Sequence, residues 1–235
     1  MSEWNQQPGW IDGRAADTGE RERVFFRSVY TWMFGGLLLT TVAAFWVITS
    51  PAMQKLILGN RAVFFGLLIA EVAVVFYASW ALTRLTPLAA AALFMVYSLM
   101  TGLTISVIVF MYTAASVVQA FAIAGGMFAA MSIYGRVTKR DLTSWGSFLF
   151  MGVIGLILAS VGNMFFKSNA ADMAISTIAV FIFVGLTAYK TQALRNMALT
   201  NAVASETLAI YGALSLYITF INLFLNLLRL FGRRR

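Results

Sequence analysis

The sequence contains no cysteine and no histidine. Without cysteine there are no disulfides and no thiol redox chemistry, and without histidine there is no His-ligated metal and no Ser-His or Cys-His nucleophile pair. The chain also lacks the HExxH metal motif and a pair of aspartates within its apolar segments. These absences predict a protein that is not an enzyme and that has no metal site and no cofactor.

Charge is also scarce, because only 11% of the 235 residues are charged, whereas 60% are hydrophobic. With a mean hydropathy of +0.82, this composition is typical of polytopic membrane proteins rather than soluble domains. The net charge of +8 does not indicate nucleic acid, because the basic residues are dispersed in short loops between apolar segments. The predicted partner is the lipid bilayer.

Stretches without charge predict the number of membrane spans, because each span must cross about 30 Å of hydrocarbon. Residues 85–135 form a stretch of 51 residues, which suits two spans joined by a turn near Tyr112 and Thr113. The remaining stretches predict one span each: 28–54, 62–83 (interrupted only by Glu71), 142–166, a short 173–189, and 207–228. The predicted fold class is an all-α membrane protein, a seven-transmembrane helix bundle.

The two ends of the chain differ from this apolar middle. Residues 1–24 are polar and mixed in charge and contain Pro8 and three glycines, which predicts a mobile cytoplasmic tail rather than a cleaved signal peptide. Residues 25–231 then form the membrane bundle, and residues 232–235 form a basic C-terminal tail.

Lys and Arg are distributed unevenly between the two sides that seven spans define. Ten lie on the side of the N-terminus (Arg14, Arg21, Arg23, Arg27, Arg84, Arg136, Lys139, Arg140, Lys190 and Arg195), against three in the opposite loops (Lys55, Arg61 and Lys167). By the positive-inside rule we expect the N-terminus in the cytoplasm and the chain in the inner (plasma) membrane. Arg229 and residues 233–235 disagree, since they fall on the outer side; the alternative is one re-entrant segment with the C-terminal tail inside.

The last apolar stretch carries a ridge of polar side chains. They are spaced three or four residues apart and occupy one arc of a helix about 27 Å long: Tyr211, Ser215, Thr219, Asn222, Asn226 and Arg229. Amides and hydroxyls that face lipid lack hydrogen-bond partners, so the ridge is expected to face other helices or a wet cavity. It serves either as packing between helices or as the lining of an ion path.

Glu71 is the only acidic residue deep within a predicted span. A charged carboxylate there costs on the order of 2.5–3.5 kcal/mol, so it handles protons or cations, or it stays protonated in a structural hydrogen bond. The expected partners are the hydroxyls of Tyr97, Thr101 and Thr104 or the amides of the last span. Small residues are expected to allow close approach of helices: Gly35, Gly36, Gly102, Gly125, Gly126, Gly152 and Gly155.

From about residue 25 onward, the order of loops and spans resembles the Bax inhibitor-1/YccA family of multi-pass membrane proteins. The likeness rests on five segments: NRAVFFGLLIAEVAVVF (60–76), LFMVYSLMTGLTIS (93–106), GMFAAMSIYGRVTKRDLTSWGSFLFMGVIGLILASVGNMFF (126–166), FVGLTAYKTQALRNM (183–197) and GALSLYITFINLFLNLLRLFG (212–232). The resemblance implies a bundle with the last helix central, wrapped by the other six.

The resemblance also implies a function. Bacterial members are described as pH-sensitive calcium leaks closed by two aspartates, one ending the sixth helix and one midway along the seventh. Other members are linked to control of a membrane-anchored quality-control protease, and eukaryotic members to calcium homeostasis and suppression of cell death. In this chain the matching positions are Lys190 and Thr219, so both carboxylates are absent.

This departure changes the expected chemistry of the centre, because calcium requires oxygen ligands and a charged ammonium offers no lone pair. Lys190 either extends to the membrane interface or acts as a tethered cation that reaches Thr219 and the Asn222 side chain. The candidate ion path or gate comprises Lys190, Thr219, Asn222, Asn226, Ser215 and Glu71. The predicted function is a calcium or cation leak; the alternative is a non-conducting regulator that binds a membrane complex such as a quality-control protease.

Overall fold

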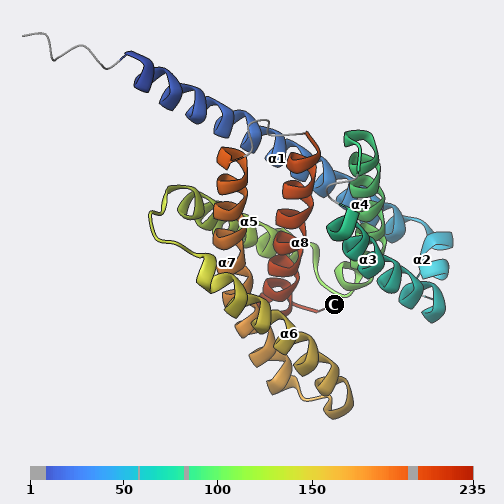
Figure 1. Cartoon of the computed structure of the whole chain (residues 1–235). Helices are drawn as coiled ribbons and strands as arrows, with labels where there is room; N and C mark the ends of the chain where they lie inside the picture. Colours follow the sequence, from blue (N-terminus) through green and yellow to red (C-terminus); the bar gives the residue numbers. More distant parts are fainter. Residues whose placement is uncertain (1–8, 58, 82–84, 201–205, 235) are drawn as a thin grey trace, which may run out of the picture.

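The computed structural model describes residues 9–57, 59–81, 85–200 and 206–234, with side chains from residue 19 onward except at residue 79. Seven of its helices are long and apolar enough to cross a membrane, and no strand occurs in the described ranges. Figure 1 shows their arrangement. The helices are α1 (Gly9–Thr49), the short α2 (Pro51–Ile57), α3 (Arg61–Ala81), α4 (Pro87–Phe110), α5 (Ala114–Val137), α6 (Thr143–Phe166), α7 (Asn169–Thr200) and α8 (Glu206–Phe231).

The last helix occupies the centre of the bundle, which confirms the predicted fold class (Figure 1). Two thirds (67%) of the apolar window of α8 is buried, against 6% for α3 and 11% for α6. Its neighbours are α1, α4, α5 and α7, whereas α3 packs mainly on α4 and α6 on α7. The expectation that six helices wrap α8 is therefore corrected: four helices surround it, and α3 and α6 form an outer layer.

The expected turn near Tyr112 and Thr113 is present, because α4 ends at Phe110 and α5 begins at Ala114. Thr113 caps α5 by accepting a hydrogen bond from the backbone N–H of Ser116 (3.3 Å). The sixth span is longer than expected, because α7 continues through Lys190 to Thr200. A charged residue ends an apolar stretch of sequence without ending the helix.

The N-terminal segment differs from the expected tail. Residues 1–8 lie outside the described residues, while residues 9–24 are helical and continuous with the first span in α1. Arg84 and Arg235, which entered the charge count, also lie outside the described residues.

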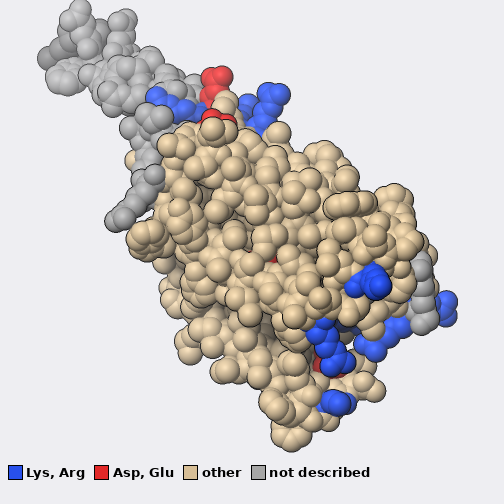
Figure 2. Space-filling model, turned by 90° about the vertical axis from the view of Figure 1, so that its right-hand side faces the viewer, with Lys and Arg blue, Asp and Glu red and all other residues tan. Residues whose placement is uncertain are grey.

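The direction of the helices divides the molecule into two sides. The N-terminal side holds Glu22 and the loop 138–142, and the C-terminal side holds the turn 111–113 and residues 232–234. The C-terminal segment pairs with that turn, since Tyr112 and Arg234 form an antiparallel bridge. The described chain therefore reaches Arg234 on the side opposite Glu22, as seven full spans require. In Figure 2, Lys and Arg gather at opposite ends of the visible face, and the broad band between them shows only a small spot of acidic surface.

The loop 138–142 is fixed to α7 by one side chain. Gln192 donates from Nε2 to the carbonyl of Arg140 (2.8 Å) and accepts from the N–H of Leu142 (2.8 Å). Asp141, two residues before α6, accepts from the N–H of Thr143 (2.8 Å), the first residue of that helix. Hydrogen bonds from Thr143 lower the pKa of the exposed Asp141 carboxyl.

Candidate functional site

The site is built around Lys190, which lies on α7 five residues before Arg195 and so about 7 Å deeper in the bundle. Its half-buried side chain crosses to α8. Nζ donates to Thr219 Oγ1 (2.9 Å) and to the backbone carbonyl of Ser215 (3.1 Å). Lys190 therefore binds the central helix instead of extending to the membrane interface.

The expected contact of Lys190 with the Asn222 side chain does not occur in the structure. Asn222 Nδ2 donates to the carbonyl of Ile218 (2.8 Å), and Asn226 Nδ2 donates to the carbonyl of Asn222 (2.8 Å). Thr219 likewise donates to the carbonyl of Ser215 (3.0 Å). These side chains satisfy their donors within α8 itself, as Ser and Thr commonly do in membrane helices. Among the described residues, the hydrogen bonds that join this ridge to a second helix come from Lys190.

The ridge is not the most enclosed face of α8. Thr219 and Asn226 are buried, but Tyr211, Ser215 and Asn222 are only half-buried. The fully covered faces instead carry apolar side chains and Tyr217 against the surrounding helices (Leu216, Leu223, Leu227 and Leu228). Apolar residues pack closely without needing partners, which explains why they fill the tightest contacts. The ridge is therefore a half-covered polar stripe on α8, and two of its residues, Ser215 and Thr219, contact Lys190 of α7.

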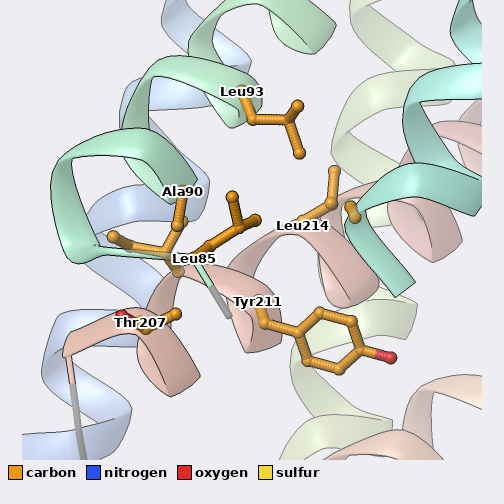
Figure 3. Close-up of a pocket in the computed structure, with 8 residues that line it drawn as sticks. Leu85, Ala90, Leu93, Thr207, Tyr211 and Leu214 are labelled. Carbon is orange, nitrogen blue, oxygen red and sulfur yellow. The ribbon is translucent and has the colours of Figure 1, made fainter. Parts of the chain in front are cut away.

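A small apolar pocket lies at the beginning of this stripe, between the start of α8 and the helices α3 and α4. In Figure 3, Leu85, Leu93 and Leu214 point toward the same space, whereas the ring of Tyr211 extends away from them. The pocket presents hydrocarbon to any occupant. None of its described lining residues carries a charge that could bind an ion.

Glu71 is separate from the other five candidates. It lies on the outer helix α3, and its Oε1 accepts a hydrogen bond from Thr104 Oγ1 of α4 (2.7 Å). Thr104 was one of the three hydroxyls expected from the sequence. The structure thus brings Lys190 of α7 to Ser215 and Thr219 of α8. Asn222 and Asn226 bond within α8, and Glu71 lies apart on the interface of α3 with α4.

Two further polar contacts were not expected from the sequence. The Tyr217 hydroxyl, fully buried on α8, shares a hydrogen bond with the Thr40 hydroxyl of α1, and its ring packs edge-on against Phe94 and Tyr97. This tyrosine lies outside the polar ridge, two residues from both Ser215 and Thr219, so periodicity assigns it to the apolar face. The sequence did offer one signal for this contact, because the hydroxyl of a tyrosine on a buried face usually needs a hydrogen-bond partner.

The second unexpected contact is an ionic junction on the N-terminal side. Glu22 of α1 bonds Arg136 of α5 (3.1 Å) through one carboxylate oxygen and Arg195 of α7 (3.1 Å) through the other. The guanidinium of Arg136 also lies over the ring of Phe26, 4.5 Å from its centroid. The junction ties together three of the four helices that surround α8. Sequence reasoning placed Glu22 in a tail and so missed it.

No group of three or more acidic side chains that could hold a metal ion occurs in the part of the chain that the structure describes. At the α7–α8 interface the ligands are an ammonium, hydroxyls, amides and backbone carbonyls. A protonated lysine occupies the oxygens of Ser215 and Thr219 that a cation would otherwise use. The arrangement therefore favours the ammonium of Lys190 over a bound metal cation at these oxygens.

Comparisons with known proteins agree with this architecture. The family described as "Inhibitor of apoptosis-promoting Bax1" matches residues 22–235. The inner membrane protein YbhL of Escherichia coli strain K12 is 46% identical over 217 residues, which cover 91% of this chain and 93% of that protein. A protein of Deinococcus radiodurans is 41% identical over 92% of this chain and 94% of its own length. A protein of Borreliella burgdorferi is 39% identical over 90% of this chain and 92% of its own length.

The family match covers most of the chain, and the relatives align with it along nearly their whole length. The seven apolar helices and the central α8 are the fold that the resemblance implied. The chain belongs to the Bax inhibitor-1 family of multi-pass membrane proteins.

Proposed function

We propose that this protein is a cation-leak protein of the inner membrane, with a cytoplasmic N-terminus, whose path beside α8 is closed by Lys190. The observation that carries the proposal is the pair of hydrogen bonds from Lys190 Nζ to Thr219 Oγ1 and to the Ser215 carbonyl. The family relation supports a leak, the name of YbhL supports the inner membrane, and the excess of basic residues in the N-terminal loops supports the orientation.

The ammonium closes the path in two ways. It occupies the oxygen atoms of the polar stripe, and it repels cations strongly, because two unit charges 4 Å apart interact by about 4 kcal/mol at an effective dielectric constant of 20. Calcium is affected most, since it carries two charges and requires several oxygen ligands. The two oxygens that Nζ contacts belong to a hydroxyl and a backbone carbonyl, and neither carries a negative charge that would offset this repulsion.

The proposal is tested by flux measurements in liposomes that contain purified protein and a calcium-sensitive dye, from pH 5 to pH 8. We expect little calcium entry with the natural sequence. The double substitution Lys190→Asp with Thr219→Asp should create calcium entry that falls at acidic pH, when the two carboxyl groups share a proton. Lys139→Asp with Thr143→Asp, an equal charge change at exposed positions on the N-terminal side, is the matched control and should not conduct.

Two results would contradict the proposal. A robust calcium leak through the natural sequence would show that Lys190 does not close the path. If neither the natural protein nor the double variant conducts calcium or monovalent cations, the leak itself is wrong. The non-conducting regulator of a membrane complex would then take its place, and crosslinking in native membranes would identify the partner.

A further inference from the structure

The two sides of the bundle differ in how their basic residues are paired with acidic ones. On the N-terminal side, Arg136 and Arg195 share the Glu22 carboxylate. The described residues of the C-terminal side include six exposed basic residues and one acidic residue, Asp172. The Asp172 carboxylate accepts a hydrogen bond from Asn163. The six are Lys55, Arg61, Lys167, Arg229, Arg233 and Arg234. Within the described ranges, no ion-pair partner is present for the three arginines of this set at the end of the chain.

The backbone that carries these arginines is fixed in place. The N–H of Thr113 donates to the carbonyl of Arg233 (3.0 Å), and the N–H of Arg233 donates to Ser116 Oγ (2.9 Å). Arg234 extends this pairing through its bridge with Tyr112. Gly232 permits the approach, because a Cβ at that position would overlap the Tyr112 ring and the Leu228 carbonyl. We call this segment, residues 232–234 paired with residues 112–116, the C-terminal strap.

The strap lies at the level of the membrane surface, because α8 ends at Phe231, directly before it. Apolar side chains beside it remain uncovered: Phe231 is 59% exposed, Met111 49% and Phe110 41%. Exposed apolar and aromatic side chains next to arginines are typical of the boundary between acyl chains and headgroups. A guanidinium there can bind a phosphate with two parallel hydrogen bonds.

We propose that the C-terminal strap is a binding site for anionic phospholipid headgroups, with Arg233 and Arg234 contacting the phosphate and Phe231 lying against the acyl chains. Charge complementarity identifies the occupant, since the charged side chains of the strap, Arg233 and Arg234, are both cationic and exposed and have no ion-pair partner among the described residues. Each basic residue near an anionic membrane surface contributes about 1 kcal/mol of attraction. The proposal does not depend on ion conduction.

A bound anionic lipid also explains why this side is basic. The positive-inside rule expects few basic residues opposite the N-terminal loops, yet Arg229, Arg233 and Arg234 all lie there. A headgroup phosphate at the strap neutralises them locally.

Lipid retention measured by native mass spectrometry tests the proposal, with protein released from nanodiscs that contain equal amounts of phosphatidylglycerol and phosphatidylcholine. We expect the natural protein to retain phosphatidylglycerol at least fivefold over phosphatidylcholine. Arg233→Gln with Arg234→Gln should reduce that preference to near unity. Lys55→Gln with Arg61→Gln, the same charge change elsewhere on the C-terminal side, should keep most of it.

Further arms distinguish a specific site at the strap from diffuse surface charge and from binding of free phosphate. Arg233→Lys with Arg234→Lys keeps the charge but loses the two-pronged geometry, and we expect partial retention. The helical signal in circular dichroism checks that each variant is folded. Equal loss in the two glutamine pairs would show diffuse surface charge and overturn the proposal. So would a rise in melting temperature with millimolar inorganic phosphate equal to that with phosphatidylglycerol, because the site would then bind free phosphate.

Discussion

The central helix α8 and the outer helices α3 and α6 have nearly the same mean hydropathy, 1.9 for α8 and α3 and 2.1 for α6. Their positions are nevertheless opposite, since 67% of the α8 window is buried against 6% and 11% for the other two. Hydropathy therefore measures whether a segment prefers the membrane. It does not determine whether the segment lies at the centre of a bundle or against lipid.

The difference follows from what drives helix association in lipid. Acyl chains are as apolar as leucine, so burying an apolar face gains little, and packing and hydrogen bonds decide which helices meet. The helix α8 offers a polar stripe that binds Lys190 and a buried tyrosine that binds Thr40. The outer helices instead expose large apolar side chains, including Ile69 and Phe76 on α3 and Phe165 and Phe166 on α6.

The comparison predicts its largest effect where the inner helices touch. A Cβ on Gly102 of α4 would overlap the backbone of Thr40 and the side chain of Ala43 on α1, whereas one on Gly155 of α6 would meet nothing within 4 Å. We expect Gly102→Ala to lower the free energy of unfolding by about 2–3 kcal/mol, because packed helices tolerate overlap poorly. Gly155→Ala should change it by no more than about 0.5 kcal/mol.

Both values can be measured by titration with SDS, followed by circular dichroism. Equal losses in the two variants would show that α6 is packed as tightly as the inner helices, in the membrane or through an oligomer. The distinction between a central and an outer layer would then be wrong.

A smaller effect is expected at the polar stripe. Thr219→Val keeps the shape of the side chain but removes the hydroxyl that accepts from Lys190 Nζ. A lost hydrogen bond to a charged group predicts a decrease in the free energy of unfolding of about 1–2 kcal/mol. The control is Thr177→Val on α7, whose hydroxyl is exposed and donates only to the carbonyl of Met173 in its own helix. A loss in the control as large as that at Thr219 would show that the hydrogen bond between Lys190 and Thr219 contributes nothing to stability.

Much of the fold could be predicted from the sequence, because a membrane restricts the choices. Charge-free stretches gave seven spans and the turn at Tyr112, and the spacing of the polar ridge together with the family resemblance gave the central last helix. The contact between Lys190 and Thr219 was expected because the resemblance matches these two positions to the family's pair of aspartates. Of the seven glycines expected at helix contacts, Gly36, Gly102 and Gly152 have close neighbours, whereas Gly35, Gly125, Gly126 and Gly155 have none within 4 Å.

The contacts that were missed depend on which helices become neighbours. Periodicity places residues on a face of one helix, but it cannot give the rotation of that helix against the next. Glu22 was assigned to a tail because a polar segment of mixed charge can be either a tail or an exposed helix. Its partners Arg136 and Arg195 lie on other helices, so the local sequence does not reveal the ion pairs that hold Glu22 in place. Self-bonded amides such as that of Asn222 were also not expected, because a polar ridge was assumed to need external partners.

The smallest effect is expected at Glu71, the ionisable residue of the outer layer. Glu71→Gln keeps an oxygen that accepts from Thr104 Oγ1, and it removes the cost of a carboxylate in the membrane, so the free energy of unfolding should change by less than about 0.5 kcal/mol. Thr104→Val removes the bonded hydroxyl and should cost up to about 1 kcal/mol. The same SDS titration measures both. If Glu71→Gln instead destabilised the protein more than Thr219→Val does, the charged carboxylate of α3 would matter more than the ammonium beside α8. The polar interaction that contributes most to stability would then lie in the outer layer of the bundle. The charge of a side chain would matter more for stability than the central position of its helix.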